Sequence, residues 1–258
     1  MNQSGVYGAN IPVWTDDLWR LVDLGGFQWM VVRSDVGPGE ARLASERGIE
    51  VLLQFPDHFN KHPWSHPGQY AVEAFRKAQA FKPFARYIIL DNEPNLYPER
   101  AGQWYAEQFT RWFRAVVAVF RFFDHESYWR ILFPGLCFLP DRNPELWLRI
   151  NAENLRETWG VCSHDIWQSW GQLYDPHFGK AHDLVWSIYP PARVFITEYA
   201  NSLPGLSEND KATQYCHFLS TLPRNVQCAC LFILGGTEDW RDFWLTEGVA
   251  RVLRGCGS

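Results

Sequence analysis

Two glutamates stand at points in the sequence where a carboxylic acid could do chemistry. Glu93 follows the apolar run YIIL in segment 86–98, RYIILDNEPNLYP. Glu198 follows VFI in segment 193–202, RVFITEYANS, and lies 105 positions after Glu93. Short apolar runs rich in β-branched residues are typical of strands covered on both faces. Each glutamate is therefore predicted to lie at the carboxyl end of a buried strand.

Paired carboxyl groups at strand ends match the requirement for hydrolysing a glycosidic bond. One carboxylic acid protonates the leaving oxygen, and the other attacks the sugar or activates water. The carboxyl ends of strands carry the ligand chemistry in parallel α/β architectures, so both glutamates are candidates for these roles. Pro94 disfavours a helical backbone at the residue before it, which predicts an extended conformation for Glu93.

The elements that would position these glutamates alternate along the whole chain. Strand patterns are predicted at 5–11, 29–34, 51–55, 87–90, 131–133, 160–164, 194–196 and 226–234, and each is followed by a helical pattern. The longest predicted helix, 104–123, has apolar residues at helical spacing, and the fifth and sixth units are the weakest. The alternation predicts an α/β fold, a single-domain (β/α)8 TIM barrel over residues 1–258. A doubly wound open sheet is the alternative, but no glycine-rich phosphate turn follows an early strand.

Composition narrows the classes of partner. The chain of 258 residues is 47% hydrophobic and 21% charged, as in ordinary globular proteins, but it is rich in aromatics, with 14 Trp. The formal charge of −5 and the absence of a basic block argue against nucleic acid or an anionic membrane as a partner. A neutral ligand such as a carbohydrate fits better. The sequence shows neither a long apolar stretch nor a signal peptide, so we expect a soluble protein, with its compartment left open.

The six cysteines show neither a CxxC pair nor zinc-ligand spacing. This favours buried free thiols for Cys137, Cys162, Cys216, Cys228, Cys230 and Cys256, and a reducing compartment over an oxidising one.

With these two glutamates ending its predicted fourth and seventh strands, the sequence resembles clan A of the glycoside hydrolases. This clan comprises retaining (β/α)8 glycosidases, among them many cellulases, xylanases and β-xylosidases. Its members carry Asn-Glu-Pro after strand four and a glutamate at the end of strand seven. The resemblance implies that Glu93 is the acid/base, Asn92 binds the sugar 2-hydroxyl and Glu198 is the nucleophile, with no metal or organic cofactor. The resemblance covers the whole chain in the order of its predicted strands and helices, but only a few individual residues match the motifs of the clan.

Several further residues fit the clan pattern. Arg33, after the second strand, could donate hydrogen bonds to Glu198 and keep it ionised, or could pair with Asp35 or Glu40 instead. His164, ending the sixth strand, lies where clan members often have a His or Tyr near the nucleophile. A satisfied core histidine is the alternative, and Ile166 stands where many relatives have a Tyr.

Aromatic and histidine side chains could complete a sugar site. Trp240, after the eighth strand, matches the tryptophan on which the sugar commonly stacks in the clan, although tryptophans are often packing residues. Trp167 is a second candidate platform, with the same alternative. His58, in the loop after the third strand, is the histidine of that loop best placed to touch substrate. His58, His62 and His66 are spaced four residues apart, as metal ligands on one face of a helix would be. Pro63 and Pro67 interrupt such a helix, so this cluster is not predicted to bind a metal.

The two carboxylates are expected to differ in charge. The negative charge of an ionised Glu198 would raise the pKa of Glu93 and keep Glu93 protonated as the acid. That charge would vanish once the sugar is bonded to Glu198. Two other function classes remain open. One is a catalytically silent carbohydrate-binding barrel, and the other is a metal-dependent barrel enzyme that uses His58, His164 and carboxylates. The sugar, its linkage, endo or exo action and the oligomeric state are left open by the sequence.

Overall fold

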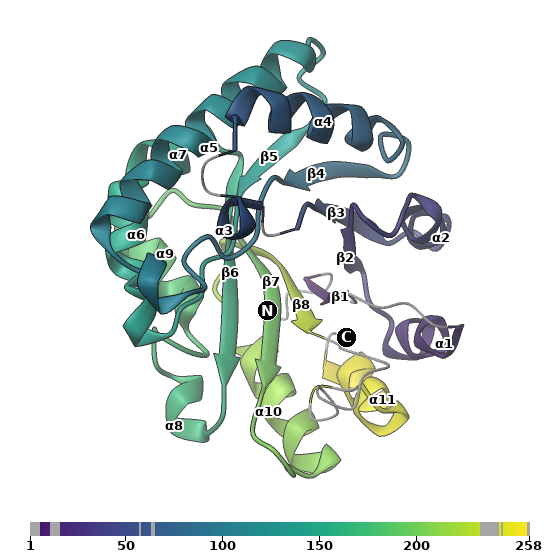
Figure 1. Ribbon diagram of the computed structural model, residues 1–258. Coiled ribbons are helices and arrows are strands. Elements are labelled where there is room, and N and C mark those ends of the chain that lie inside the picture. The colour runs from purple at the N-terminus through teal and green to yellow at the C-terminus, as the bar shows by residue number, and fades with distance from the viewer. Residues whose placement is uncertain are drawn as a thin grey trace.

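Eight parallel strands close into a barrel in the order of the sequence, and the helices surround it (Figure 1). The computed structural model describes residues 6–10, 16–56, 58–62, 65–232, 243 and 245–256. The predicted (β/α)8 barrel is confirmed, and the open doubly wound sheet is excluded because the first strand pairs with the eighth.

All eight predicted strands are present. They are β1 Tyr7–Asn10, β2 Trp29–Arg33, β3 Glu50–Gln54, β4 Ala85–Ile89, β5 Arg130–Phe133, β6 Gly160–Trp167, β7 Val194–Asn201 and β8 Val226–Phe232. The helices are α1 Asp16–Gly25, α2 Gly39–Glu46, α3 His58–Lys61, α4 Pro67–Gln79, α5 Gln103–Phe123, α6 Pro144–Ile150, α7 Ala152–Glu157, α8 Trp170–Leu173, α9 Ala181–Ile188, α10 Glu208–Ser220 and α11 Glu247–Cys256, with 3-10 turns η1 Pro98–Arg100 and η2 Pro140–Arg142. β6 and β7 run past His164 and Glu198, so these two side chains lie inside strands rather than at strand ends.

Alternation along the strands builds two separate cores. The barrel interior is filled by inward-facing side chains from successive strands, namely Val31, Leu52, Tyr87, Ile89, Leu132, Cys162, Phe195, Cys228 and Cys230. The larger core lies between the strands and the helices, where β4 contributes Ala85 and Ile88 and the next residue, Leu90, also packs. Because both faces of β4 are apolar and buried, the YIIL run is a strand covered on both sides, as its composition predicts.

Several helix boundaries follow from the capping residues in the sequence. Ser207 precedes α10, and its Oγ accepts a hydrogen bond from the Asp210 backbone N–H at 3.1 Å. Thr246 does the same for α11 through the Val249 N–H at 3.3 Å. α5, with 21 residues, is the long helix expected from the apolar spacing at 104–123. Among the described helices, none combines the length and apolar character needed to cross a membrane.

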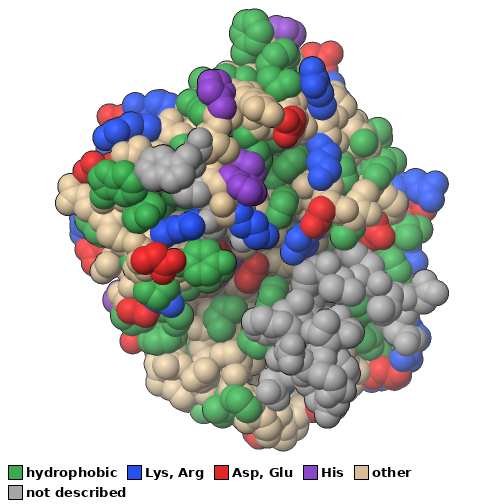
Figure 2. Space-filling view, in the orientation of Figure 1, with side chains coloured by type: hydrophobic (Ala, Val, Ile, Leu, Met, Phe, Trp, Pro, Cys, Tyr) green, Lys and Arg blue, Asp and Glu red, His purple; other side chains and the backbone are tan. Residues whose placement is uncertain are grey.

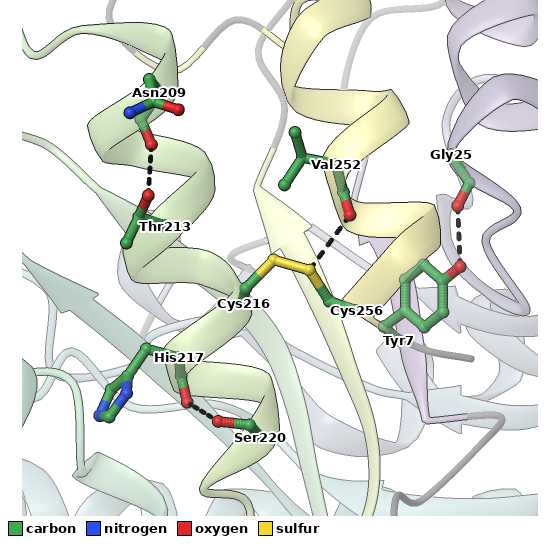
Figure 3. Close-up of a disulfide and its surroundings, with 9 residues drawn as sticks. All are labelled: Tyr7, Gly25, Asn209, Thr213, Cys216, His217, Ser220, Val252 and Cys256. Carbon is green, nitrogen blue, oxygen red and sulfur yellow. Dashed lines mark hydrogen bonds between the residues drawn. A yellow bond between two sulfur atoms is a disulfide. The ribbon is translucent and has the colours of Figure 1, made fainter.

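The cysteine prediction is wrong for two of the six residues. Cys216 of α10 and Cys256 at the end of α11 form a disulfide, which joins the last two helices of the barrel wall (Figure 3). The sequence hides this pairing because the two cysteines are 40 residues apart and become neighbours only when α11 packs on α10. Cys137, Cys162, Cys228 and Cys230 are buried free thiols, as predicted. The disulfide removes the cysteine-based argument for a reducing compartment.

Reducing the Cys216–Cys256 bond should destabilise the fold. The bond closes a loop across a sequence separation of 40 residues. Losing it should lower the free energy of unfolding by about 4 kcal/mol in the chain-entropy model. Urea unfolding with and without reductant measures this loss, and a Cys216→Ala/Cys256→Ala variant should match the reduced wild type. Thiol titration of the denatured, unreduced chain should find four thiols. Six titratable thiols would contradict the assignment.

Candidate active site

Glu93, His164 and Glu198 line one cavity of about 400 Å³. Phe138, Ile166 and other apolar residues form its walls, and its polar groups include the two carboxylates, the imidazole, Gln168 and Ser202. Glu93, in the loop after β4, and Glu198, near the end of β7, place the cavity at the carboxyl end of the barrel. Figure 2 shows a hollow near the middle of one face with an acidic patch inside and with hydrophobic and basic side chains at its border. Ligand sites of α/β barrels lie at this end.

The backbone of Glu93 is not extended, contrary to the prediction from Pro94. Its φ is 41°, in the left-handed region that few non-glycine residues adopt. Two hydrogen bonds hold this turn, from the Glu93 N–H to the Gly135 carbonyl at 3.0 Å and from the Leu96 N–H to the Glu93 carbonyl at 2.9 Å. Such backbone strain costs roughly 1–3 kcal/mol and clusters at functional sites.

Gly135 holds Glu93 and also makes room for His164. A Cβ added at Gly135 would lie 2.3 Å from His164 Nε2 and 2.6 Å from its Cδ2, which is closer than non-bonded atoms can approach. The imidazole therefore rests directly on the backbone of the loop after β5. A glycine is required here because the side chain of His164 occupies the space that any other residue would fill.

A β-bulge in β7 turns Glu198 toward the cavity. Ile196 pairs with Ser163 and Glu198 pairs with His164, so Thr197 is an extra residue in β7. Ile196 and Tyr199 both pack in the core between strands and helices, although in a regular strand they would face opposite sides. Without the bulge, Glu198 would share the face of Ile196 and point at the helices. The bulge brings its carboxylate to the interior side.

His164 lies between the two glutamates. Its Nδ1 is 2.7 Å from Glu93 Oε1 and its Nε2 is 3.8 Å from Glu198 Oε1. The imidazole is 2% exposed, against 19% for the Glu93 side chain and 12% for that of Glu198, so the histidine forms the floor and the carboxylates face the cavity. The ring of His164 contacts both candidate carboxylates, and its role in the site stays a prediction.

The charges of these groups are linked. Burial alone lowers the pKa of His164, but the negative charges of Glu198 and Glu93 and the hydrogen bond to Glu93 outweigh it and raise that pKa to about 9. Burial raises the pKa of Glu198 to about 7, with Glu93 adding to the rise and with His164 and Arg33 opposing it. At neutral pH the imidazole is therefore a cation placed between two acids.

Two polar residues of the site are missed by the sequence reasoning. Asn10, ending β1, donates from Nδ2 to Glu198 Oε1 at 3.3 Å and to the Thr197 carbonyl at 3.1 Å. Gln54, ending β3, donates from Nε2 to Asn92 Oδ1 at 2.8 Å. Both side chains are buried. The glutamates are singled out in the sequence because each follows an apolar run. The same signal marks Asn10, which ends the run GVYGAN, and Gln54, which ends the run VLLQ.

Asn92 and Arg33 have defined partners. Because Gln54 holds Asn92 Oδ1, the Asn92 Nδ2 group is the part of that amide left to donate to a ligand. Arg33 forms a two-bond ion pair with Asp35, at 3.0 and 2.6 Å, which is the alternative partner that the sequence offers. Its charge still acts on Glu198 and lowers the pKa of that carboxyl. Direct contact of Asn92 with a sugar stays a prediction.

Neither Trp167 nor His58 lines the cavity of Glu93 and Glu198. The prediction for Trp167 is wrong, because its side chain is completely buried and donates to Gln214 Oε1 of α10 at 2.8 Å. His58 lines a different cavity of about 290 Å³, where its ring stacks on Tyr70 and its Nε2 lies 2.8 Å from Ser65 Oγ. Trp240 lies outside the described residues.

The three cavity residues also form a possible cation site. One oxygen of Glu93, one oxygen of Glu198 and one nitrogen of His164 all lie within 4.8 Å of one another. Two carboxylate oxygens and an imidazole nitrogen are a donor set that zinc, manganese or iron would accept. His58 is not part of this cluster.

Comparison with known proteins identifies the fold. No family model matches the chain, and no match was found among curated proteins. Solved structures match over almost its whole length. A fungal β-1,4-galactanase is 11% identical, with a TM-score of 0.65, and the match covers 98% of this chain and 95% of that one. A family-128, subgroup III, curdlan-specific exo-β-1,3-glucanase from Blastomyces gilchristii, in complex with glucose, is 16% identical, with a TM-score of 0.60 and coverages of 98% and 99%.

A third structure is similar to the same extent. A family-128 endo-β-1,3-glucanase from Amycolatopsis mediterranei, in complex with laminaripentaose, is 12% identical, with a TM-score of 0.59 and coverages of 96% and 98%. The resemblance to clan A of the glycoside hydrolases is thus confirmed as a likeness of fold to barrel glycosidases of that clan.

A methyl group at Gly135 should disable the site without unfolding the barrel. Gly135→Ala must push His164 off the loop backbone, because its Cβ would lie 2.3 Å from Nε2. Misplacing a catalytic constellation by about 1 Å costs roughly 100-fold in rate, so we expect a loss of that order in kcat with a smaller change in KM. Gly39→Ala, where a Cβ meets nothing within 4 Å, is the matched control. Wild-type kcat in Gly135→Ala would contradict the role of Gly135.

Proposed function

We propose that this protein is a retaining glycoside hydrolase that cleaves a β-linked oligo- or polysaccharide, with Glu198 as nucleophile and Glu93 as acid/base. The observation that carries the proposal is the meeting of Glu93 and Glu198, from β4 and β7, in one cavity at the carboxyl end of the barrel. Similar folds among β-glycanases give it independent support.

The spacing of the carboxylates supports retention of configuration. Retaining enzymes hold the two carboxyl groups about 5–5.5 Å apart, whereas inverting enzymes leave about 6.5–9.5 Å for a water molecule. An oxygen of Glu93 lies within 4.8 Å of an oxygen of Glu198, which fits the shorter class. Direct attack by a carboxylate on the sugar is therefore favoured over attack by a water molecule between the two groups.

The two steps follow from this arrangement. In the first, a Glu198 oxygen bonds to the anomeric carbon, the glycosidic bond breaks, and Glu93 gives its proton to the departing oxygen. In the second, Glu93 takes a proton from water, whose oxygen displaces Glu198 from the anomeric carbon. His164 has its Nδ1 2.7 Å from Glu93 and is protonated at neutral pH. Its charge stabilises the ionised Glu198 that attacks the sugar and the ionised Glu93 that remains after proton transfer.

The walls of the cavity suit a neutral sugar. Phe138, Ile166 and Phe232 provide apolar surface for the C–H faces of a sugar ring, while the acidic residues and Gln168 provide hydrogen-bonding groups. The structural neighbours include enzymes on β-1,3-glucan and β-1,4-galactan, so these polymers come first in a substrate panel. The silent carbohydrate-binding barrel remains the alternative, and it predicts sugar binding without turnover.

A metal-dependent enzyme is the second candidate, favoured by the cluster of Glu93, His164 and Glu198 donors within 4.8 Å. The two candidates differ in their response to a chelator. A glycosidase of the proposed type keeps its rate, whereas the metal-dependent enzyme loses activity with chelator and regains it with one added divalent cation.

Neutralising either glutamate should separate their roles. Glu198→Gln should abolish turnover on every substrate, because an amide cannot form the glycosyl ester. Glu93→Gln should lower the rate roughly 10²- to 10⁴-fold on natural polysaccharides and far less on aryl glycosides, whose leaving group needs no proton. Both are measured as kcat/KM with a polysaccharide and an aryl glycoside of the same sugar.

The matched control removes a surface carboxylate. Glu46→Gln changes the same functional group on α2, where the side chain is 59% exposed, and it should keep wild-type rates. Wild-type rates on both substrates in either active-site variant would rule out the assigned roles.

The pH profile of kcat/KM should be bell-shaped, with its maximum on the alkaline side of neutral pH. Glu198 must be ionised to attack, and its pKa is raised to about 7, so kcat/KM should rise with pH through about 7. His164 loses its proton near pH 9, which removes the cation between the carboxylates, so the rate should fall above that pH. In His164→Asn the fall near pH 9 should vanish, and the acidic limb should move upward because Glu198 has lost a cation. An acidic limb near the ordinary glutamate pKa of 4.5 would contradict this account.

A further inference from the structure

A second hollow lies at the opposite end of the barrel. It has a volume of about 570 Å³ and is lined by residues at the amino-terminal ends of β4 to β7. Four of these residues are arginines, Arg86, Arg121, Arg130 and Arg193, and the one acidic residue among those lining it is Glu157. The hollow therefore carries a formal charge of about +3 at neutral pH, in a chain whose net charge is −5.

The four guanidinium groups have no carboxylate partner among the described residues. Arg130 donates to the Tyr87 hydroxyl at 2.7 Å and lies over the Trp159 ring, with its Cζ 4.5 Å from the ring centroid. Arg193 Cζ lies 4.4 Å from the same centroid. Arg121 donates to the backbone carbonyl of Glu157. Arginines elsewhere in the described chain, such as Arg42 and Arg149, pair with a glutamate one helical turn away.

An unsatisfied donor lies in the same lining. Trp129 is 6% exposed, and its indole Nε1 has no hydrogen-bond partner. A buried N–H without an acceptor costs free energy, and such groups usually find a partner in the protein or in ordered water. The hollow thus combines four arginines with a single acidic residue, Glu157, and its lining includes a buried donor that has no acceptor. An oxyanion would supply the negative charge that balances the excess of arginines.

We propose that this hollow binds a small molecule through its phosphate or sulfate groups, and that it is a ligand site separate from the carboxylate cavity. Guanidinium groups bind such oxyanions through paired, charge-assisted hydrogen bonds. With a volume of about 570 Å³, the hollow has room for a ligand that carries more than one such group or a further moiety. The proposal does not depend on the hydrolase assignment, because the two sites lie at opposite ends of the strands.

The competing explanation is that the arginines only close the bottom of the barrel by stacking on Trp159 and Tyr87. Arg86 separates the two explanations, since it is exposed and makes no ion pair or ring contact among the described residues. Its charge adds to an anion site and contributes nothing to stacking. Replacing it with glutamine should therefore weaken anion binding and leave the fold intact.

The test is calorimetric titration of the full chain with tripolyphosphate at constant ionic strength. We expect one saturable site, binding roughly tenfold weaker in Arg86→Gln because one charge-assisted contact is lost, and no change in hydrolysis. Arg76→Gln, on the exposed face of α4, removes the same charge outside the hollow and should bind as wild type. Arg193→Gln should weaken binding as Arg86→Gln does, with folding checked by circular dichroism.

Two further ligands identify the source of the oxyanion. A nucleoside triphosphate and a sulfated disaccharide are titrated in the same way, and the one that binds more tightly while responding to Arg86→Gln indicates the ligand class. Absence of saturable binding for all three ligands would overturn the proposal. So would equal weakening in Arg76→Gln, because the anions would then respond only to the overall charge of the protein.

Discussion

The site depends on a protonated imidazole held between two carboxylates in the mouth of the barrel. Glu93, His164 and Glu198 come from three different parts of the chain, and each needs a local distortion or a vacant position to reach the others. Glu93 adopts a positive φ, Glu198 follows an extra residue in β7, and His164 occupies space that Gly135 leaves open. Gathering two acids in a buried place is unfavourable, and the charge of His164 offsets that repulsion.

Much of the architecture could be predicted from local patterns. The eight strands, the long α5 and the caps of α10 and α11 follow from apolar spacing and capping residues, which are local properties of the chain. The alternation of side chains between the two faces of β6 would also have corrected the prediction for Trp167. His164 and Trp167 are three positions apart on β6, so in a regular strand they face opposite sides, and a His164 that faces the cavity requires a Trp167 that packs against the helices.

Other features depend on contacts between distant residues. The turn at Glu93 is set by a hydrogen bond to Gly135, and the pairing of Cys216 with Cys256 is set by helix packing. The bulge at Thr197 is invisible in the run VFITEYAN, because the register of β7 is fixed by its neighbours β6 and β8. Asn10 and Gln54 carry a local signal, but only the closed barrel reveals that they hold Glu198 and Asn92.

The two ends of the barrel differ in charge. Acidic groups gather in the cavity at the carboxyl end, and arginines gather in the hollow at the amino end, so ligands of different charge suit the two sites. The barrel interior between the two sites is filled with apolar side chains. Ligand binding at one end can therefore be changed by substitution without altering groups at the other.

The central claim is that Glu198 forms a covalent bond to the sugar. It is tested most directly by incubating the protein with activated 2-fluoro glycosides of several β-linked sugars, followed by mass spectrometry of the intact chain and its peptides. The fluorine slows the breakdown of a glycosyl ester, so the account predicts a single added sugar on the peptide that contains Glu198, and no addition in Glu198→Gln. A protein that hydrolyses the corresponding substrate but is labelled at another residue, or is never labelled, would contradict the account.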